Sequence, residues 1–170
     1  SLERLVSGGA EVVAAVTQPD RRRGRGQQSP PSAVKVAALA HGIPVLQPER
    51  AADTVFGAQL TTAEPDLGVV AAYGKMLPDS VLETPRLGTI NVHASLLPRY
   101  RGAAPIHRAI IAGERETGIT MIRLVRQMDA GPMLARAVYP IAEDDTSKGA
   151  ERALADLGAT LLLDTVAALD

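Results

Sequence analysis

The sequence predicts an α/β fold in which helices flank a mostly parallel sheet. Short valine-rich runs are typical of strands buried on both faces, and they cover residues 11–19, 43–48, 67–74 and 87–95. Helical patterns separate these runs at 33–42, 49–63 and 78–85. Strands that alternate with helices in this way form Rossmann-like sheets. The length of 170 residues suits one such domain.

The limits of several elements follow from their end residues. The first residues, Ser-Leu-Glu-Arg-Leu, indicate the last turns of a helix. Ser32 can cap the helix that follows it, and Gly42 can end that helix. Beyond the fourth strand we expect a helix at 104–114, strands at 118–125 and 134–141, and an amphipathic helix at 147–170. An interruption of this last helix is expected near Gly158.

The composition excludes several classes of function. The chain has no cysteine, which excludes thiolate catalysis, cysteine–zinc sites and a disulfide scaffold. No cluster has metal-ligand spacing, so we expect no metal. Because no apolar run approaches 18 residues, we expect no membrane span. The absence of cysteine is consistent with an intracellular protein, and we expect a cytoplasmic one. With one Phe, three Tyr and no Trp, platforms for stacking single-stranded nucleic acid are not expected.

The net charge of −1 conceals a strongly basic segment. Residues 20–26 read DRRRGRG, which places Arg21, Arg22, Arg23 and Arg25 within five positions. A basic loop on a nearly neutral domain indicates contact with an anion, although a solvated loop has the same composition. The segment does not match the GxxxxGK[ST] pattern of a phosphate-binding loop.

Asn91 and His93 are the strongest candidates for chemistry. They lie two residues apart on the strand predicted at 87–95, so both side chains point to one face near the carboxyl end of the strand, where ligands bind. The Asn91 amide can donate to a developing oxyanion, and the His93 imidazole can move a proton near neutral pH. Two polar residues satisfied at the end of a strand would give the same pattern.

The loop after this strand reads Ser95-Leu96-Leu97-Pro98 and continues to Gly102. Pro98 fixes one backbone angle, and Gly102 permits a conformation that other residues resist. Leucines beside a candidate site suggest the wall of a pocket for a flat, partly apolar ligand. The alternative is that they fold back onto the core.

Asp129 follows a strand-like run and precedes Ala130-Gly131. Its carboxylate can orient His93, favour the charged imidazole or hold a water. It can also close a turn by binding its own backbone, and the two roles are compatible. His41, at the end of a helix, and His107, on a helix, are expected to have structural or surface roles.

Together these stretches resemble the folate-dependent formyltransferase family. The resemblance rests on Asn91-x-His93, then Ser-Leu-Leu-Pro, Arg101-Gly102 and Asp129. It implies a formyltransferase fold and formyl transfer from 10-formyltetrahydrofolate, a co-substrate, to an amine. It also implies that the catalytic residues are Asn91, His93 and Asp129, and that the folate contacts are Ser95, Leu96, Leu97 and Pro98.

Further stretches resemble the branch of this family whose acceptor is the α-amine of methionyl-initiator tRNA, used in translation initiation. They are 17-TQPDRRRGRG-26, 33-AVKVAALAHGIPVLQP-48, 70-VAAYGKMLP-78 and 102-GAAPIHRAI-110. The resemblance implies that the arginine segment binds tRNA and that Arg25 matches the key arginine of that branch. It also implies that residues 1–170 are a catalytic domain whose first strand lies before Ser1, with a β-barrel domain after Asp170. We expect a monomer.

Two other readings stay open. In the first, the same chemistry serves a small acceptor, such as glycinamide ribonucleotide, an amino sugar nucleotide or water. A small acceptor needs no arginine-rich loop, which ranks this reading lower. In the second, the domain is a binding module without catalysis. The second reading requires His93 and Asp129 to point apart rather than into one cleft.

Overall fold

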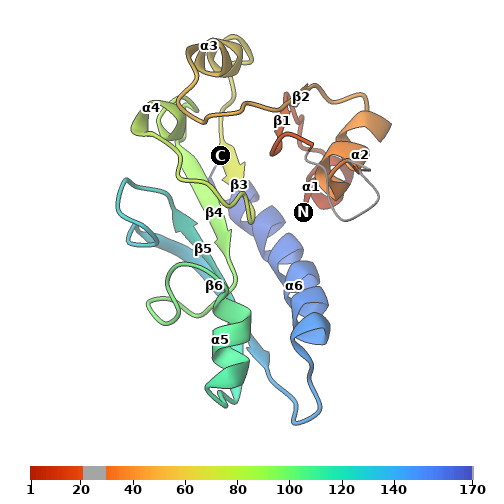
Figure 1. Cartoon of the computed structure of the whole chain (residues 1–170), viewed down its shortest axis with the longest axis vertical. Coiled ribbons are helices and arrows are strands. Elements are labelled where there is room, and N and C mark those ends of the chain that lie inside the picture. The colour runs from red at the N-terminus through yellow and green to blue at the C-terminus, as the bar shows by residue number, and fades with distance from the viewer. Residues whose placement is uncertain (21–29, 170) are drawn as a thin grey trace.

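The computed structural model describes residues 1–20 and 30–169, and the predicted tRNA contacts Arg21, Arg22, Arg23 and Arg25 lie outside these residues. Figure 1 shows the arrangement of the elements. The helices are α1 (Leu2–Ser7), α2 (Ala33–Ala40), α3 (Thr54–Thr62), α4 (Asp79–Leu82), α5 (Pro105–Ile111) and α6 (Ser147–Ala167). The strands are β1 (Ala15–Val16), β2 (Val45–Leu46), β3 (Gly68–Val70), β4 (Thr89–His93), β5 (Glu116–Arg123) and β6 (Met133–Pro140).

The strands form two hydrogen-bonded sheets. β1 and β2 pair in parallel, and a four-stranded sheet has the order β3-β4-β5-β6. β3 and β4 are parallel, whereas β5 is antiparallel to both β4 and β6. The predicted α/β class is confirmed, but the sheet is more mixed than the strand patterns indicated. The link from β5 to β6 spans only 124–132, which is shorter than a parallel crossover needs, so these two strands must run antiparallel.

One face of the larger sheet is covered by α6, the long helix that runs beside β4, β5 and β6 in Figure 1. The core between them is fully buried and consists of Ile90, Ile119, Met121, Leu154 and Leu162. The interruption predicted in the last helix is absent, because α6 continues through Gly158. A Cβ on Gly158 would lie only 3.1 Å from the Val92 side chain, so glycine lets the helix approach the sheet closely.

A smaller core forms where α1 and α2 meet the β1–β2 pair, around Ala15, Ala38 and Ile43. The start predicted for α2 is confirmed, because the Ser32 hydroxyl accepts a hydrogen bond of 3.2 Å from the Lys35 amide. None of the helices among the described residues is both long and apolar enough to pass through a membrane.

The loop of residues 94–104 packs against the other face of the sheet. Leu97 is buried, and its amide donates to the Thr120 hydroxyl of β5 over 3.1 Å. The same hydroxyl donates to the Ser95 carbonyl over 2.7 Å. A Cβ on Gly118 would lie 2.6 Å from the Leu96 side chain and 2.1 Å from the Ala137 carbonyl. Glycine at this position therefore lets Leu96 sit directly on β5.

The position of Leu154 in the central core predicts the effect of shortening its side chain. Leu154 is 1% exposed, so Leu154→Ala should lower the free energy of unfolding by about 2–5 kcal/mol because it leaves a cavity. Leu39→Ala is the matched control, since Leu39 is 60% exposed, and its effect should stay within about 0.5 kcal/mol. Urea unfolding measures both, and equal losses would contradict this placement of the core.

Candidate active site

A pocket of about 610 Å³ opens at the carboxyl ends of β3 and β4. Asn91 and His93 line it from β4, and Asp129 lines it from the link between β5 and β6. The structure therefore brings the three predicted catalytic residues together. The loop of residues 94–104 contributes Gly102 to the same wall. Parallel strands place their carboxyl ends at one edge, which is the usual position of ligand sites in such sheets.

The alternation of β4 gives Asn91 and His93 one shared face. In the ladder with β5, Asn91 lies opposite Ile122 and His93 lies opposite Thr120. Val92, between them, points to the other face and packs against the core under α6. His93 is only 6% exposed, so its ring is held by the surrounding protein rather than by solvent.

The two ring nitrogens of His93 face different partners. Nε2 lies 3.2 Å from the backbone carbonyl of Tyr100. Because a carbonyl oxygen only accepts, Nε2 carries the proton in this arrangement. Nδ1 lies 3.7 Å from Oδ2 of Asp129, which is an ion-pair separation and too long for a direct hydrogen bond. The imidazole thus presents Nδ1 to the carboxylate and the pocket.

Asp129 is buried, 8% exposed, and its backbone is left-handed with φ 46°. Its Oδ2 accepts a hydrogen bond of 2.8 Å from the Gly102 amide, which comes from a loop 27 residues earlier. The carboxylate is therefore tied to the loop of residues 94–104 as well as facing His93. The sequence also allowed Asp129 to bind its own backbone in a turn, but this oxygen is oriented by the Gly102 amide instead.

Four residues that do not line the pocket hold this loop, and we call them the Tyr100 cluster: Arg99 and Tyr100 of the loop, with Arg108 and Glu114. The Tyr100 hydroxyl donates to Oε1 of Glu114 over 2.6 Å, and Arg99 forms an ion pair with the same carboxylate. The guanidinium of Arg108 lies 5.4 Å from the centre of the Tyr100 ring. The hydrogen bond from Tyr100, followed by that from Arg99, lowers the pKa of Glu114 below its usual value.

The four predicted folate contacts are placed differently from the catalytic residues. Ser95, Leu96, Leu97 and Pro98 do not line the pocket that holds Asn91 and His93. Ser95 is fully buried and its hydroxyl donates to the Arg99 carbonyl over 2.6 Å. The leucines fold back onto the sheet, which was the alternative left open for them. The contact of these four residues with folate stays a prediction.

Sequence reasoning missed much of the pocket wall. The segment of residues 70–77 lines one side of the pocket. His107 and Glu151 line another side, where Nδ1 of His107 lies 3.8 Å from Oε1 of Glu151. His107, which was expected only to have a structural or surface role, therefore belongs to the pocket. Gly74 was the available signal for the first segment, since a glycine just after a predicted strand indicates a turn, and in the structure it adopts φ 76°.

Tyr73 connects the pocket wall to the rest of the fold. Its carbonyl accepts a hydrogen bond of 2.8 Å from the Gln18 side chain. Its hydroxyl is buried with no partner found among the described residues, and burial raises the pKa of Tyr73.

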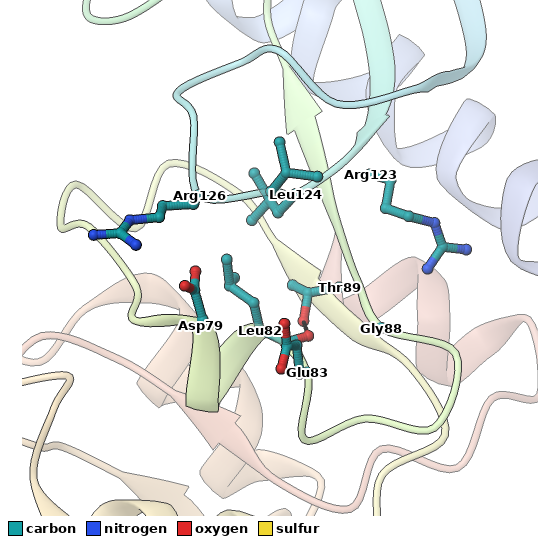
Figure 2. Close-up of a pocket in the computed structure, with 9 residues that line it drawn as sticks. Asp79, Leu82, Glu83, Gly88, Thr89, Arg123, Leu124 and Arg126 are labelled. Carbon is teal, nitrogen blue, oxygen red and sulfur yellow. Dashed lines mark hydrogen bonds between the residues drawn. The ribbon is translucent and has the colours of Figure 1, made fainter.

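A second pocket of about 290 Å³ adjoins the first and shares Leu82, Leu124 and Val125 with it. Figure 2 shows Asp79 and Glu83 beside Leu82, and Arg123 and Arg126 on either side of Leu124. Within residues 1–20 and 30–169, no three or more His, Asp or Glu side chains gather as they would to hold a metal ion.

The sequence profile of the family described as "Formyl transferase" matches residues 2–166. The chain belongs to the formyl transferase family. A methionyl-tRNA formyltransferase of Thiobacillus denitrificans is 52% identical over 170 residues, all of this chain and 55% of that protein. One of Pseudomonas putida is 50% identical over 168 residues, 99% of this chain and 54% of that protein. The chain thus spans about half the length of the curated relatives it matches.

Solved structures of the family share the fold. A phosphoribosylglycinamide formyltransferase of Bacillus halodurans matches with a TM-score of 0.82 at 24% identity, covering 96% of this chain and 86% of that chain. A formyltetrahydrofolate deformylase of Pseudomonas syringae matches with a TM-score of 0.78 at 21% identity, covering 97% of this chain and 54% of that chain. At these identities the likeness confirms the predicted formyltransferase fold and carries no choice of acceptor.

The lowered pKa of Glu114 predicts a pH-dependent stability. Because the folded carboxyl has a lower pKa than the unfolded one, its stabilisation is full above the unfolded value and is lost as the pH falls through the folded value. Glu114→Gln should therefore lower the thermal midpoint at about pH 7 and lose this effect by about pH 3. Glu116→Gln, at an exposed position two residues on, is the control. A difference between Glu114→Gln and wild type that does not change with pH would contradict the ionic role of Glu114.

Proposed function

We propose that the full-length protein carrying this chain transfers a formyl group from 10-formyltetrahydrofolate to the α-amine of methionyl-initiator tRNA, for translation initiation. The observation that carries this proposal is the convergence of Asn91, His93 and Asp129 on one pocket in a member of the formyl transferase family. Relatives about half identical over the whole chain are named methionyl-tRNA formyltransferases, which supports this acceptor.

The chemistry joins the acceptor nitrogen to the formyl carbon. The amine attacks the formyl carbon with its lone pair, and the carbonyl oxygen becomes an oxyanion. The Asn91 amide and the charged His93 imidazole stabilise that oxyanion by hydrogen bonding. Asp129, 3.7 Å from Nδ1, keeps the imidazole oriented toward the pocket. The bond from the formyl carbon to N10 of the folate then breaks, and the proton lost by the amine is delivered to N10.

The pocket fits a folate co-substrate in size and polarity. A volume of about 610 Å³ lies within the range of small-molecule sites. Val70, Leu77 and Leu124 give it apolar walls, while Asn91, His93 and Asp129 supply a few convergent polar groups. This is the pattern expected for a flat, partly apolar ligand. The contacts proposed between the folate and Ser95, Leu96, Leu97 and Pro98 lie outside this lining, on the loop that follows β4.

The residues before the arginine segment support its assignment to tRNA. Gln18 bonds the Tyr73 carbonyl of the pocket wall, and Gln47 donates to the Gln18 carbonyl over 2.9 Å and to Asp20 over 3.1 Å. Lys35 also pairs with Asp20, and its hydrogen bond is the first cause that lowers the pKa of this carboxyl. The segment with Arg21, Arg22, Arg23 and Arg25 therefore begins from an anchored residue linked to the pocket, where an acceptor would bind.

The small-acceptor alternative is supported only at the level of fold, by structures of glycinamide ribonucleotide transformylases and of a deformylase below 25% identity. Rates of formyl transfer by the full-length protein to methionyl-tRNA and to glycinamide ribonucleotide, and its rate of formate release by hydrolysis, separate these functions. Formylation of methionyl-tRNA at least about tenfold faster than of the others supports the proposal. Preference for a small acceptor overturns it.

Loss of an oxyanion donor should abolish most turnover. Asn91→Ala and His93→Ala should each lower kcat by at least about 10²–10³-fold, because each removes stabilisation that exists only in the transition state. Single-turnover formylation with the full-length protein measures this, and circular dichroism checks folding. His41→Ala is the matched control, since His41 pairs with Glu3 outside the pocket. Near wild-type turnover in His93→Ala would contradict the mechanism.

The arginine segment should act on the acceptor and not on the folate. Arg25→Ala should raise KM for methionyl-tRNA and weaken the dependence of this KM on salt. With one phosphate contact fewer, tRNA binding releases fewer counterions. The KM for the folate should stay unchanged. Arg86→Ala is the control, because Arg86 is 70% exposed and pairs with Asp66. Equal losses for both substrates would show that the segment supports the folate site instead.

A further inference from the structure

We propose that Glu114 is a positioning residue for His93 and acts through the Tyr100 cluster. Glu114 does not line the pocket, but one residue, Tyr100, connects it to the imidazole. Tyr100 makes both contacts: its hydroxyl donates to Glu114 over 2.6 Å, and its carbonyl accepts from Nε2 of His93 over 3.2 Å. The kinetic consequences of this inference rest on the proposed function, whereas its structural consequence does not.

The backbone of Tyr100 needs this support. Its φ of 55° is left-handed, a conformation that a bulky residue adopts only where the surroundings hold it. Glu114 is itself well fixed, since its side chain is 20% exposed and its amide bonds the Ala109 carbonyl at the end of α5. The guanidinium groups of Arg99 and Arg108, 5.9 and 5.4 Å from the ring centre, add contacts to the Tyr100 ring.

Three successive carbonyls of the loop each accept from a different side chain. The Arg99 carbonyl accepts from Ser95 over 2.6 Å, the Tyr100 carbonyl from His93, and the Arg101 carbonyl from Arg108 over 2.8 Å. The next amide, that of Gly102, holds Asp129. A rotation of residue 100 would therefore disturb the contacts of both His93 and Asp129.

This arrangement controls which nitrogen of His93 carries the proton when the ring is neutral. The Tyr100 carbonyl requires a proton on Nε2, which leaves Nδ1 to face Asp129. If the carbonyl turns away, the neutral ring can take either tautomer, and its orientation toward the pocket is no longer fixed. The expected cost is in the chemical step and not in substrate binding.

Two variants test the kinetic consequence in the full-length protein. Glu114→Ala removes the anchor, and Tyr100→Phe removes only the hydroxyl while keeping the ring and the carbonyl. Each should lower kcat for formyl transfer roughly 10–100-fold, with KM for either substrate changed less than about threefold. Glu114→Gln retains an oxygen that accepts from Tyr100 and should recover part of the loss. Glu116→Ala, at an exposed position of β5, is the control.

The structural consequence is read directly by nitrogen NMR of ¹⁵N-histidine-labelled protein. Wild type should show His93 as the Nε2-protonated tautomer when neutral, and Glu114→Ala and Tyr100→Phe should show a mixture. If Glu114→Ala fails to fold, Tyr100→Phe carries the test. Unchanged His93 signals and unchanged kcat in the folded variants overturn the proposal. A changed tautomer in a protein that does not formylate methionyl-tRNA supports the positioning role and rejects the proposed function.

Discussion

The hydrogen bond from the Gly102 amide to the Asp129 carboxylate, 2.8 Å long, joins two loops that leave different strands. One loop follows β4 and the other links β5 to β6, and each carries a residue that His93 needs. Without this bond, Asp129 would have no fixed relation to the imidazole. A low-dielectric site stabilises charge in the transition state best when its polar groups are already held in place. This contact therefore governs how well the pocket can stabilise developing charge.

The two faces of the four-stranded sheet have different tasks. The face under α6 is a packed apolar core around Ile90, Met121 and Leu154, which makes β4 and β5 a rigid base. The other face carries the polar chemistry, and its loop is held by Thr120 and by the Tyr100 cluster. The left-handed backbone of Tyr100, Ala104 and Asp129 shows that the loops around the pocket adopt costly conformations. Such conformations persist because the contacts around them outweigh their cost.

The sequence predicts the parts of this site that depend on periodicity. Alternation along β4 places Asn91 and His93 on one face, and the order of strands and helices predicts the α/β class. Contact between Asp129 and His93 was one of two roles open from the sequence, and only the family resemblance favoured it, because no local pattern brings together residues 36 positions apart. The Tyr100 carbonyl and the Gly102 amide could not be predicted, since backbone atoms carry no identity in the sequence. The antiparallel pairing of β5 and β6 follows from the length of their link, which strand patterns alone do not use.

Formyl transfer in this proposal occurs where Asn91, His93 and Asp129 converge. A crystal structure of the full-length protein with a non-transferable analogue of 10-formyltetrahydrofolate tests this placement most directly. We expect the carbonyl oxygen of the analogue to lie roughly 3 Å from the Asn91 amide nitrogen and from a ring nitrogen of His93. An analogue bound with this oxygen outside the pocket, or pointing away from both side chains, would contradict the account.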